Sequence, residues 1–172
     1  MQMMEQLLKV MIEYEAGNAQ RVQHFLKVYE FATLIATREG VDERTMQILQ
    51  MAALVHDCGI RPSLAKYNSS GGEYQQKEGP LVAEPMLRSI GFEEDLIERV
   101  CFLVAHHHTY TNIDGLDYQI LVEADFLVNI LEENQSIPQV VHVRSNVFRT
   151  PAGIWLLDQM YLPELAKKYQ AE

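Results

Sequence analysis

The stretch ILQMAALVHDCGI, residues 48–60, is an apolar helical run that ends in an adjacent histidine and aspartate, His56 and Asp57. Its apolar residues predict a helix against the core, so the pair at its end also lies where water is scarce. An ionised carboxylate there is costly unless it is paired or bound to a cation. The pair can equally be a helix cap or a turn, so its meaning depends on matching groups elsewhere.

Two other segments supply such groups. His24 shares a predicted helical stripe with Val28 and Phe31, and Asp125 shares another with Leu121. A core histidine is often only hydrogen-bonded, and an aspartate can pair with an arginine, although aspartate is a poor helix former. Two imidazoles and two carboxylates can instead share one divalent cation. That donor set suits Zn²⁺, Mn²⁺, Fe²⁺ or Co²⁺ better than a Ca²⁺ cage of oxygens.

Helical periodicity dominates the rest of the chain, and strand signals are nearly absent. The 172 residues predict a single all-α domain of seven or eight helices spanning 1–172. The predicted helices cover 2–15, 19–39, 43–56, 79–90, 93–106, 117–133, 137–145 and 151–169. Residues 58–77 lack periodicity and predict a long functional loop, and Pro85 is expected to kink or shorten its helix.

Composition restricts the class of partner. The chain carries 24 acidic and 14 basic residues, a formal net charge of -10, which disfavours nucleic acid or an anionic membrane as the main partner. A small anionic substrate remains compatible if a metal or local cations receive it. Cys58 and Cys101 predict free thiols and a cytoplasmic protein, and Cys58 has no second cysteine at zinc-finger spacing. The N-terminus lacks the features of a signal peptide, and no apolar stretch reaches about 20 residues.

Taken together, these segments resemble the HD-domain superfamily of metal-dependent phosphohydrolases. The matching stretches lie between about residues 20 and 134, and FRTPAGIWLLDQMYL (148–162) is similar to a closing helix of many members. They are RVQHFLKVYEFATLIA, ILQMAALVHDCGI, GPLVAEPMLRSIGF, VCFLVAHHH and LVEADFLVN. The resemblance implies an all-helical core with flanking terminal helices. It also implies one divalent ion (Mn, Fe, Co, Zn or Mg) bound by His24, His56, Asp57 and Asp125.

One position departs from the two-metal members of this superfamily. Many of them have a histidine four residues before the glycine of the next helix, where this chain has Gln75 before Gly79. A glutamine binds divalent metals poorly, which favours a single ion per site. In the superfamily, histidines at the place of His106, His107 and His108 bind a second metal or contact substrate, and of the three His107 is the one we expect to reach the site. An exposed polar cluster at a helix end is the alternative.

The resemblance also implies roles for individual residues. Asp57 accepts a proton from water while it binds the metal, and His106 or His107 protonates the leaving oxygen. The cations that can hold the phosphate are Arg21, Arg61 and Lys66, with Arg144 and Arg149 as more distant candidates. Each of them can alternatively be a solvated surface residue. His108 is a further candidate for contact with the substrate.

The predicted function is hydrolysis of a small phosphorylated metabolite, a nucleotide phosphoester in the first instance. A non-catalytic module that binds metal or nucleotide as a sensor is the alternative, and an oxygenase-like relative with paired iron is a third. The Met-rich first helix predicts a homo-oligomer, unless Met3, Met4 and Met11 pack on the domain's own core.

Overall fold

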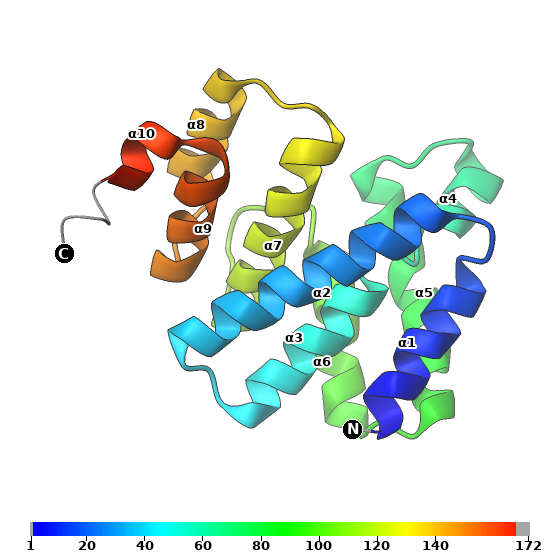
Figure 1. Ribbon diagram of the computed structural model, residues 1–172. Coiled ribbons are helices and arrows are strands. Elements are labelled where there is room, and N and C mark those ends of the chain that lie inside the picture. The colour runs from blue at the N-terminus through cyan, green and yellow to red at the C-terminus, as the bar shows by residue number, and fades with distance from the viewer. Residues whose placement is uncertain (1, 168–172) are drawn as a thin grey trace.

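The computed structural model describes residues 2–167, which form ten helical segments and no strand (Figure 1). The all-α prediction is confirmed, with two more segments than expected. They are α1 (Gln2–Tyr14), α2 (Ala19–Glu39), α3 (Glu43–Val55), α4 (Ile60–Tyr67), α5 (Gly72–Ile90), α6 (Glu94–His106), α7 (Leu116–Glu132), α8 (Ile137–Asn146), α9 (Pro151–Tyr161) and α10 (Pro163–Ala166).

Local capping explains where the central helices begin. The Asp42 carboxylate accepts the Thr45 backbone N–H at 2.8 Å and starts α3. The Asn18 side chain accepts the Arg21 N–H at 3.2 Å and starts α2. α2 ends at Gly40, whose φ of 69° a residue with a side chain rarely adopts. These signals are local in sequence, so the predicted bounds of α2 and α3 agree with the structure to within a residue.

The long α2 lies at the centre of the molecule. It packs against α3 on one side and α7 on another, and α3 also packs against α6 and α7 (Figure 1). Val28, Leu49 and Leu121 come from these three helices and are fully buried in one core. The packing brings the second turn of α2, the end of α3 and the middle of α7 to one place.

The predicted loop over 58–77 is wrong. Residues 60–67 form α4, and α5 begins at Gly72 and continues through Pro80 and Pro85 to Ile90. Tertiary contacts hold α4 on α5: the Tyr67 and Tyr74 rings stack 4.4 Å apart, and Glu78 binds both Lys66 and the Tyr67 hydroxyl. Such contacts leave no periodic signal in the sequence.

The last predicted helix, 151–169, is two helices in the structure. α9 ends at Tyr161 because Pro163 disfavours helical backbone at Leu162, whose φ and ψ are −127° and 63°. Residues 168 and 169 lie outside the described part of the chain.

A buried carboxylate ties α8 and α9 to α7. Glu123 is fully buried and accepts the backbone N–H groups of Arg149 and Thr150 at 2.6 and 2.9 Å, and the Thr150 hydroxyl also donates to it. Thr150 in turn caps α9 through the Gly153 N–H. These hydrogen bonds hold the segment between α8 and α9 against the part of α7 that carries Asp125.

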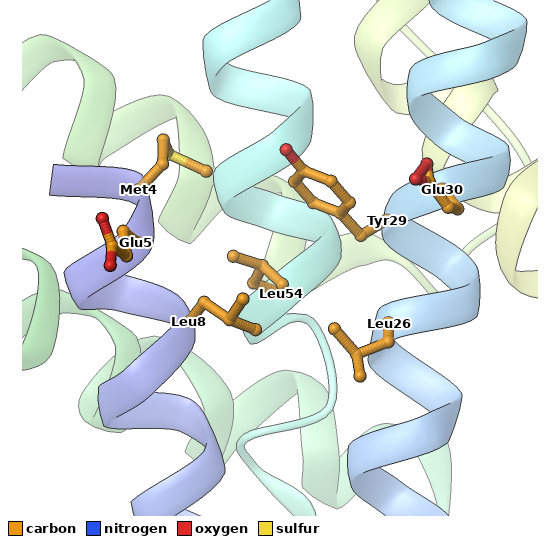
Figure 2. Close-up of a pocket in the computed structure, with 7 residues that line it drawn as sticks. All are labelled: Met4, Glu5, Leu8, Leu26, Tyr29, Glu30 and Leu54. Carbon is orange, nitrogen blue, oxygen red and sulfur yellow. The ribbon is translucent and has the colours of Figure 1, made fainter. Parts of the chain in front are cut away.

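The first helix places its methionines differently. Met11 is buried in the core, as the packing alternative proposed, whereas Met3 is exposed. Met4 lines an apolar groove of about 410 Å³ between α1, α2 and α3 (Figure 2). Among the described residues, no helix combines the length and apolar character that a bilayer crossing requires.

Candidate metal centre

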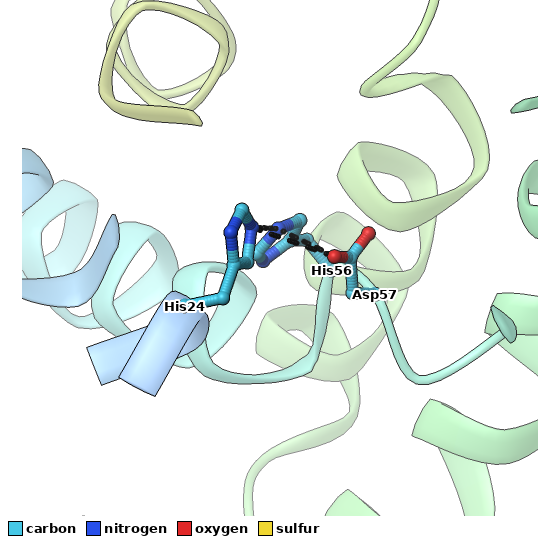
Figure 3. A group of neighbouring side chains, drawn as sticks. All are labelled: His24, His56 and Asp57. Carbon is cyan, nitrogen blue, oxygen red and sulfur yellow. Dashed lines mark hydrogen bonds and ion pairs between the residues drawn. The ribbon is translucent and has the colours of Figure 1, made fainter. Parts of the chain in front are cut away.

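Four side chains from three separate segments converge on one point. The Nε2 atom of His24, on α2, lies 3.2 Å from His56 Nε2, 3.4 Å from Asp57 Oδ2 and 3.2 Å from Asp125 Oδ1. His56 Nε2 lies 3.5 Å from Asp57 Oδ2 and 3.6 Å from Asp125 Oδ1. Figure 3 shows His24, His56 and Asp57 facing one another. The structure therefore brings together the four residues that the sequence singled out.

The turn after α3 orients the side chains of His56 and Asp57 toward the metal centre. His56 continues the helical backbone, and a tight turn follows in which the Ile60 N–H donates to the Asp57 carbonyl at 3.0 Å. Gly59 allows this turn to touch α5, because a Cβ atom there would lie 2.5 Å from the Gln75 carbonyl and 2.7 Å from the Gly79 nitrogen. The glycine thus brings Asp57 against α5 without a side chain in the way.

The hydrogen bonds at the back of the rings fix which nitrogen carries the proton. His56 Nδ1 lies 2.8 Å from the Ala53 carbonyl, which can only accept, so Nδ1 donates and Nε2 keeps its lone pair. His24 Nδ1 lies 2.9 Å from Glu132 Oε2 and is fixed in the same way. When both rings are neutral, two nitrogen lone pairs and the oxygens of Asp57 and Asp125 face one another with no donor between them. Asp125 Oδ1 is buried and makes no hydrogen bond within the described residues. This donor set fits a divalent cation.

In the ion-free protein, protons have to offset the two carboxylates. Burial opposes protonation of His56, but the carboxylates of Asp57 and Asp125 outweigh it and raise its pKa to about 9. The pKa of His24 is also raised, against the effect of burial, chiefly by its contact with Asp125. Burial would raise the pKa of Asp57, yet His56 and His107 hold it well below its usual range. A bound cation would displace these protons.

Without a cation, the stability of the protein is expected to fall as the pH rises from about 6.5 to about 9. A folded-state pKa raised above the unfolded value stabilises the protein below the unfolded pKa, and that stability is lost as the pH rises through the folded pKa. For His56, raised from 6.5 to about 9, the loss is on the order of 3 kcal/mol. Thermal unfolding in chelator and in excess Mn²⁺ checks this, because the ion-loaded protein should keep its stability across the range. The same pH dependence in both would contradict it.

Asp57 also belongs to a second group of donors. One donor atom from each of Asp57, His107 and His108 lies within 4.8 Å of the other two. His107 Nδ1 lies 2.8 Å from the Val104 carbonyl, so its Nε2 keeps the lone pair and faces Asp57 Oδ1 at 3.6 Å. Nε2 of His107 and Nε2 of His108 are both buried without a hydrogen-bond partner among the described residues. The three side chains can hold an ion that shares Asp57 with the first group.

The third histidine of the cluster points elsewhere. His106 stacks on Phe102 at 4.2 Å between ring centroids, and its Nδ1 lies 2.7 Å from the Phe102 carbonyl. It belongs to neither group of donors, so the catalytic role predicted for His106 has no geometric support. Gln75 donates to the Ser70 carbonyl at 2.7 Å.

A polar cleft of about 430 Å³ opens onto the centre. His24, Asp57 and Arg21 are among the residues that line it. Of the predicted phosphate-binding cations, Arg21 alone is among the described lining residues, and its guanidinium lies 3.6 Å from the Glu15 carboxylate. Its other described lining residues are Asn18, Gln20, Ile60, Ser70, Asn129, Glu132 and Glu133.

The other predicted cations are engaged elsewhere. Arg61 donates to the Tyr14 carbonyl and covers the Tyr14 ring at 4.9 Å, and Lys66 pairs with Glu78. Arg144 pairs with Asp158 at 2.5 Å, and Arg149 donates to backbone carbonyls at the end of α8. Their side chains are held by these contacts and do not line the cleft, which corrects the substrate-binding assignments of Arg61 and Lys66.

Cys58 is not placed as a ligand. Its thiol donates to the Gly79 carbonyl at 3.3 Å, and burial raises its pKa far above the ordinary value. It therefore stays a neutral thiol that packs in the turn after α3.

Glu132 contacts His24 in the structure but was not singled out from the sequence. The available signal was its position seven residues after Asp125, two helical turns along the same face.

Known proteins resemble this chain in sequence pattern and in fold. The chain matches the family model of the HD domain over residues 21–141. It is similar in structure to a "predicted HD superfamily hydrolase" from an uncultured Thermotogales bacterium. The TM-score is 0.66 and the sequence identity 24%, over 97% of this chain and 91% of that chain. Likeness at this identity is a likeness of fold. No curated protein matches the chain significantly.

Proposed function

Because the chain belongs to the HD domain family, we propose that it is a metal-dependent phosphohydrolase acting on a small phosphorylated metabolite, with nucleotide phosphoesters as the first class to test. The observation that carries this proposal is the convergence of His24, His56, Asp57 and Asp125 with their lone pairs facing one another. A divalent ion held there would lower the pKa of bound water and would offset the charge that develops on a phosphoryl group.

The protein's own groups take defined parts in this reaction. Asp57 is the carboxylate ligand that lines the cleft, where it can orient the attacking water. Because a carboxylate that binds a divalent cation must stay ionised, we assign Asp57 to orientation rather than to removal of the water's proton. Arg21 receives the anionic substrate in the cleft. The volume of about 430 Å³ suits a small-molecule substrate.

We also propose that the centre binds a second ion, through Asp57, His107 and His108. The presence of Gln75 had led us to expect a single ion. The bare Nε2 atom of His107 suits a ligand better than a proton donor, because its Nδ1 proton is already given to the Val104 carbonyl. In this centre His108 supplies the donor that Gln75 lacks.

Replacing His108 by alanine is expected to lower the number of tightly bound Mn²⁺ ions from two to one per chain. His106→Ala is the matched control, because His106 lies in the same cluster but outside both donor groups, and it should keep both ions. Isothermal titration of chelated protein counts the ions. The two-ion centre would be contradicted if the unmodified protein bound only one ion, or if His108→Ala still bound two.

The proposed activity is tested with chelated protein reloaded with Mn²⁺, Co²⁺ or Mg²⁺ and offered a panel of nucleotide and sugar phosphoesters. Turnover that depends on added ion and is reversed by chelator is the expected result. Tight nucleotide binding without turnover of any phosphoester would contradict hydrolysis and favour the sensor alternative.

A further inference from the structure

The carboxylate of Glu132 contacts the Nδ1 side of the His24 ring, away from the nitrogen that faces the metal centre. Its Oε2 atom lies 2.9 Å from His24 Nδ1, and its Oε1 atom accepts a hydrogen bond from Lys27 at 2.6 Å. We propose that Glu132 is a positioning residue that fixes the protonation and orientation of His24, so that Nε2 points at the ion. This inference rests on the proposed metal centre and assigns a role to a residue outside the four predicted ligands.

Helix geometry explains how α7 contacts both nitrogens of one ring. Asp125 and Glu132 are seven residues apart on α7 and therefore lie on the same face, which packs against α2. Asp125 Oδ1 lies 3.2 Å from His24 Nε2, while Glu132 Oε2 holds Nδ1 from the other side. The ring is thus held between two carboxylates of a single helix.

His24 needs such a partner more than the other two imidazoles do. His56 and His107 follow the ends of α3 and α6, where each Nδ1 bonds a backbone carbonyl three residues earlier, that of Ala53 and of Val104. His24 lies inside α2, where backbone carbonyls are used by the helix itself. A side chain from another helix has to accept its Nδ1 proton.

The charge on this partner has a consequence for the metal. A carboxylate that accepts the Nδ1 proton makes the opposite nitrogen a more basic ligand and fixes the tautomer that can bind an ion. Lys27, three residues after His24 on α2, neutralises the second oxygen of Glu132. This ion pair holds the carboxylate in place against the His24 ring.

The test compares Mn²⁺ binding, measured by titration of chelated protein, in Glu132→Ala and Glu133→Ala. The dissociation constant should rise by about 10- to 100-fold in Glu132→Ala, the usual effect of losing a partner of a ligating histidine. Glu133→Ala removes the same charge from the same cleft but no bond to His24, and should change it by less than about threefold. Glu132→Gln, whose amide oxygen still accepts a hydrogen bond, should fall between them.

Imidazole nitrogen resonances give a second readout that a purely structural role would not change. In ion-free samples at a pH above the raised pKa of His24, the neutral ring should carry its proton on Nδ1 in the unmodified protein and in Glu133→Ala, and should shift toward Nε2 protonation in Glu132→Ala. Equal weakening in both alanine variants would reduce the effect to net charge and overturn the inference. If the unmodified protein binds no Mn²⁺, the proposed function fails; if it binds normally and Glu132→Ala does too, only this inference fails.

Discussion

Asp57→Asn is expected to lower kcat for phosphoester hydrolysis by on the order of 1,000-fold, equivalent to about 4 kcal/mol of transition-state stabilisation. The physical reason is that one carboxylate serves the whole centre. Its Oδ2 atom faces His24 and His56, and its Oδ1 atom faces His107. The amide keeps the size of the side chain but removes its charge. Steady-state kinetics at saturating Mn²⁺ measure the effect.

Glu98→Gln is the matched control, because it makes the same chemical change at an exposed carboxylate of α6 that belongs to neither donor group. It should leave kcat unchanged. Circular dichroism should show that Asp57→Asn remains folded. A folded Asp57→Asn protein with kcat within about tenfold of the unmodified enzyme would remove Asp57 from the mechanism.

Asp125→Asn is expected to weaken Mn²⁺ binding at the first group by at least about 100-fold, since even the outer partners of a metal ligand are worth about 10–100-fold. Asp125 Oδ1 is buried, faces the Nε2 atoms of His24 and His56, and makes no hydrogen bond within the described residues. The carboxylate would be an uncompensated buried charge unless protons or a cation offset it. Titration of chelated protein with Mn²⁺ gives the dissociation constants.

The same variant has a second expected signature. Asp125 helps to raise the pKa of His56, so its removal should reduce the loss of ion-free stability between about pH 6.5 and pH 9. Affinity for Mn²⁺ equal to that of Glu98→Gln would show that Asp125 is not a ligand.

The sequence was sufficient for the helices of the core and for the four central side chains. The bounds of α2 and α3 depend on caps and periodicity within a few residues of each helix end, such as Asp42 and Gly40. His24 and Asp125 could be found because ionisable groups on apolar stripes require compensation.

The remaining features depend on contacts that no local pattern carries. α4 and the first turns of α5 are held by Tyr67, Tyr74 and Glu78 across the two helices. Which of three adjacent histidines faces the centre depends on the exact end of α6, where His106 turns onto Phe102 and His107 does not. The hydrogen bond from His24 to Glu132 depends on how α7 is rotated against α2.

X-ray diffraction from crystals grown with Mn²⁺, recorded for its anomalous signal, would locate the ion in the protein. We expect an ion about 2.0–2.3 Å from Nε2 of His24, Nε2 of His56 and one oxygen each of Asp57 and Asp125. Anomalous density confined to other parts of the surface, with these four side chains still in contact and no ion among them at saturating Mn²⁺, would contradict it.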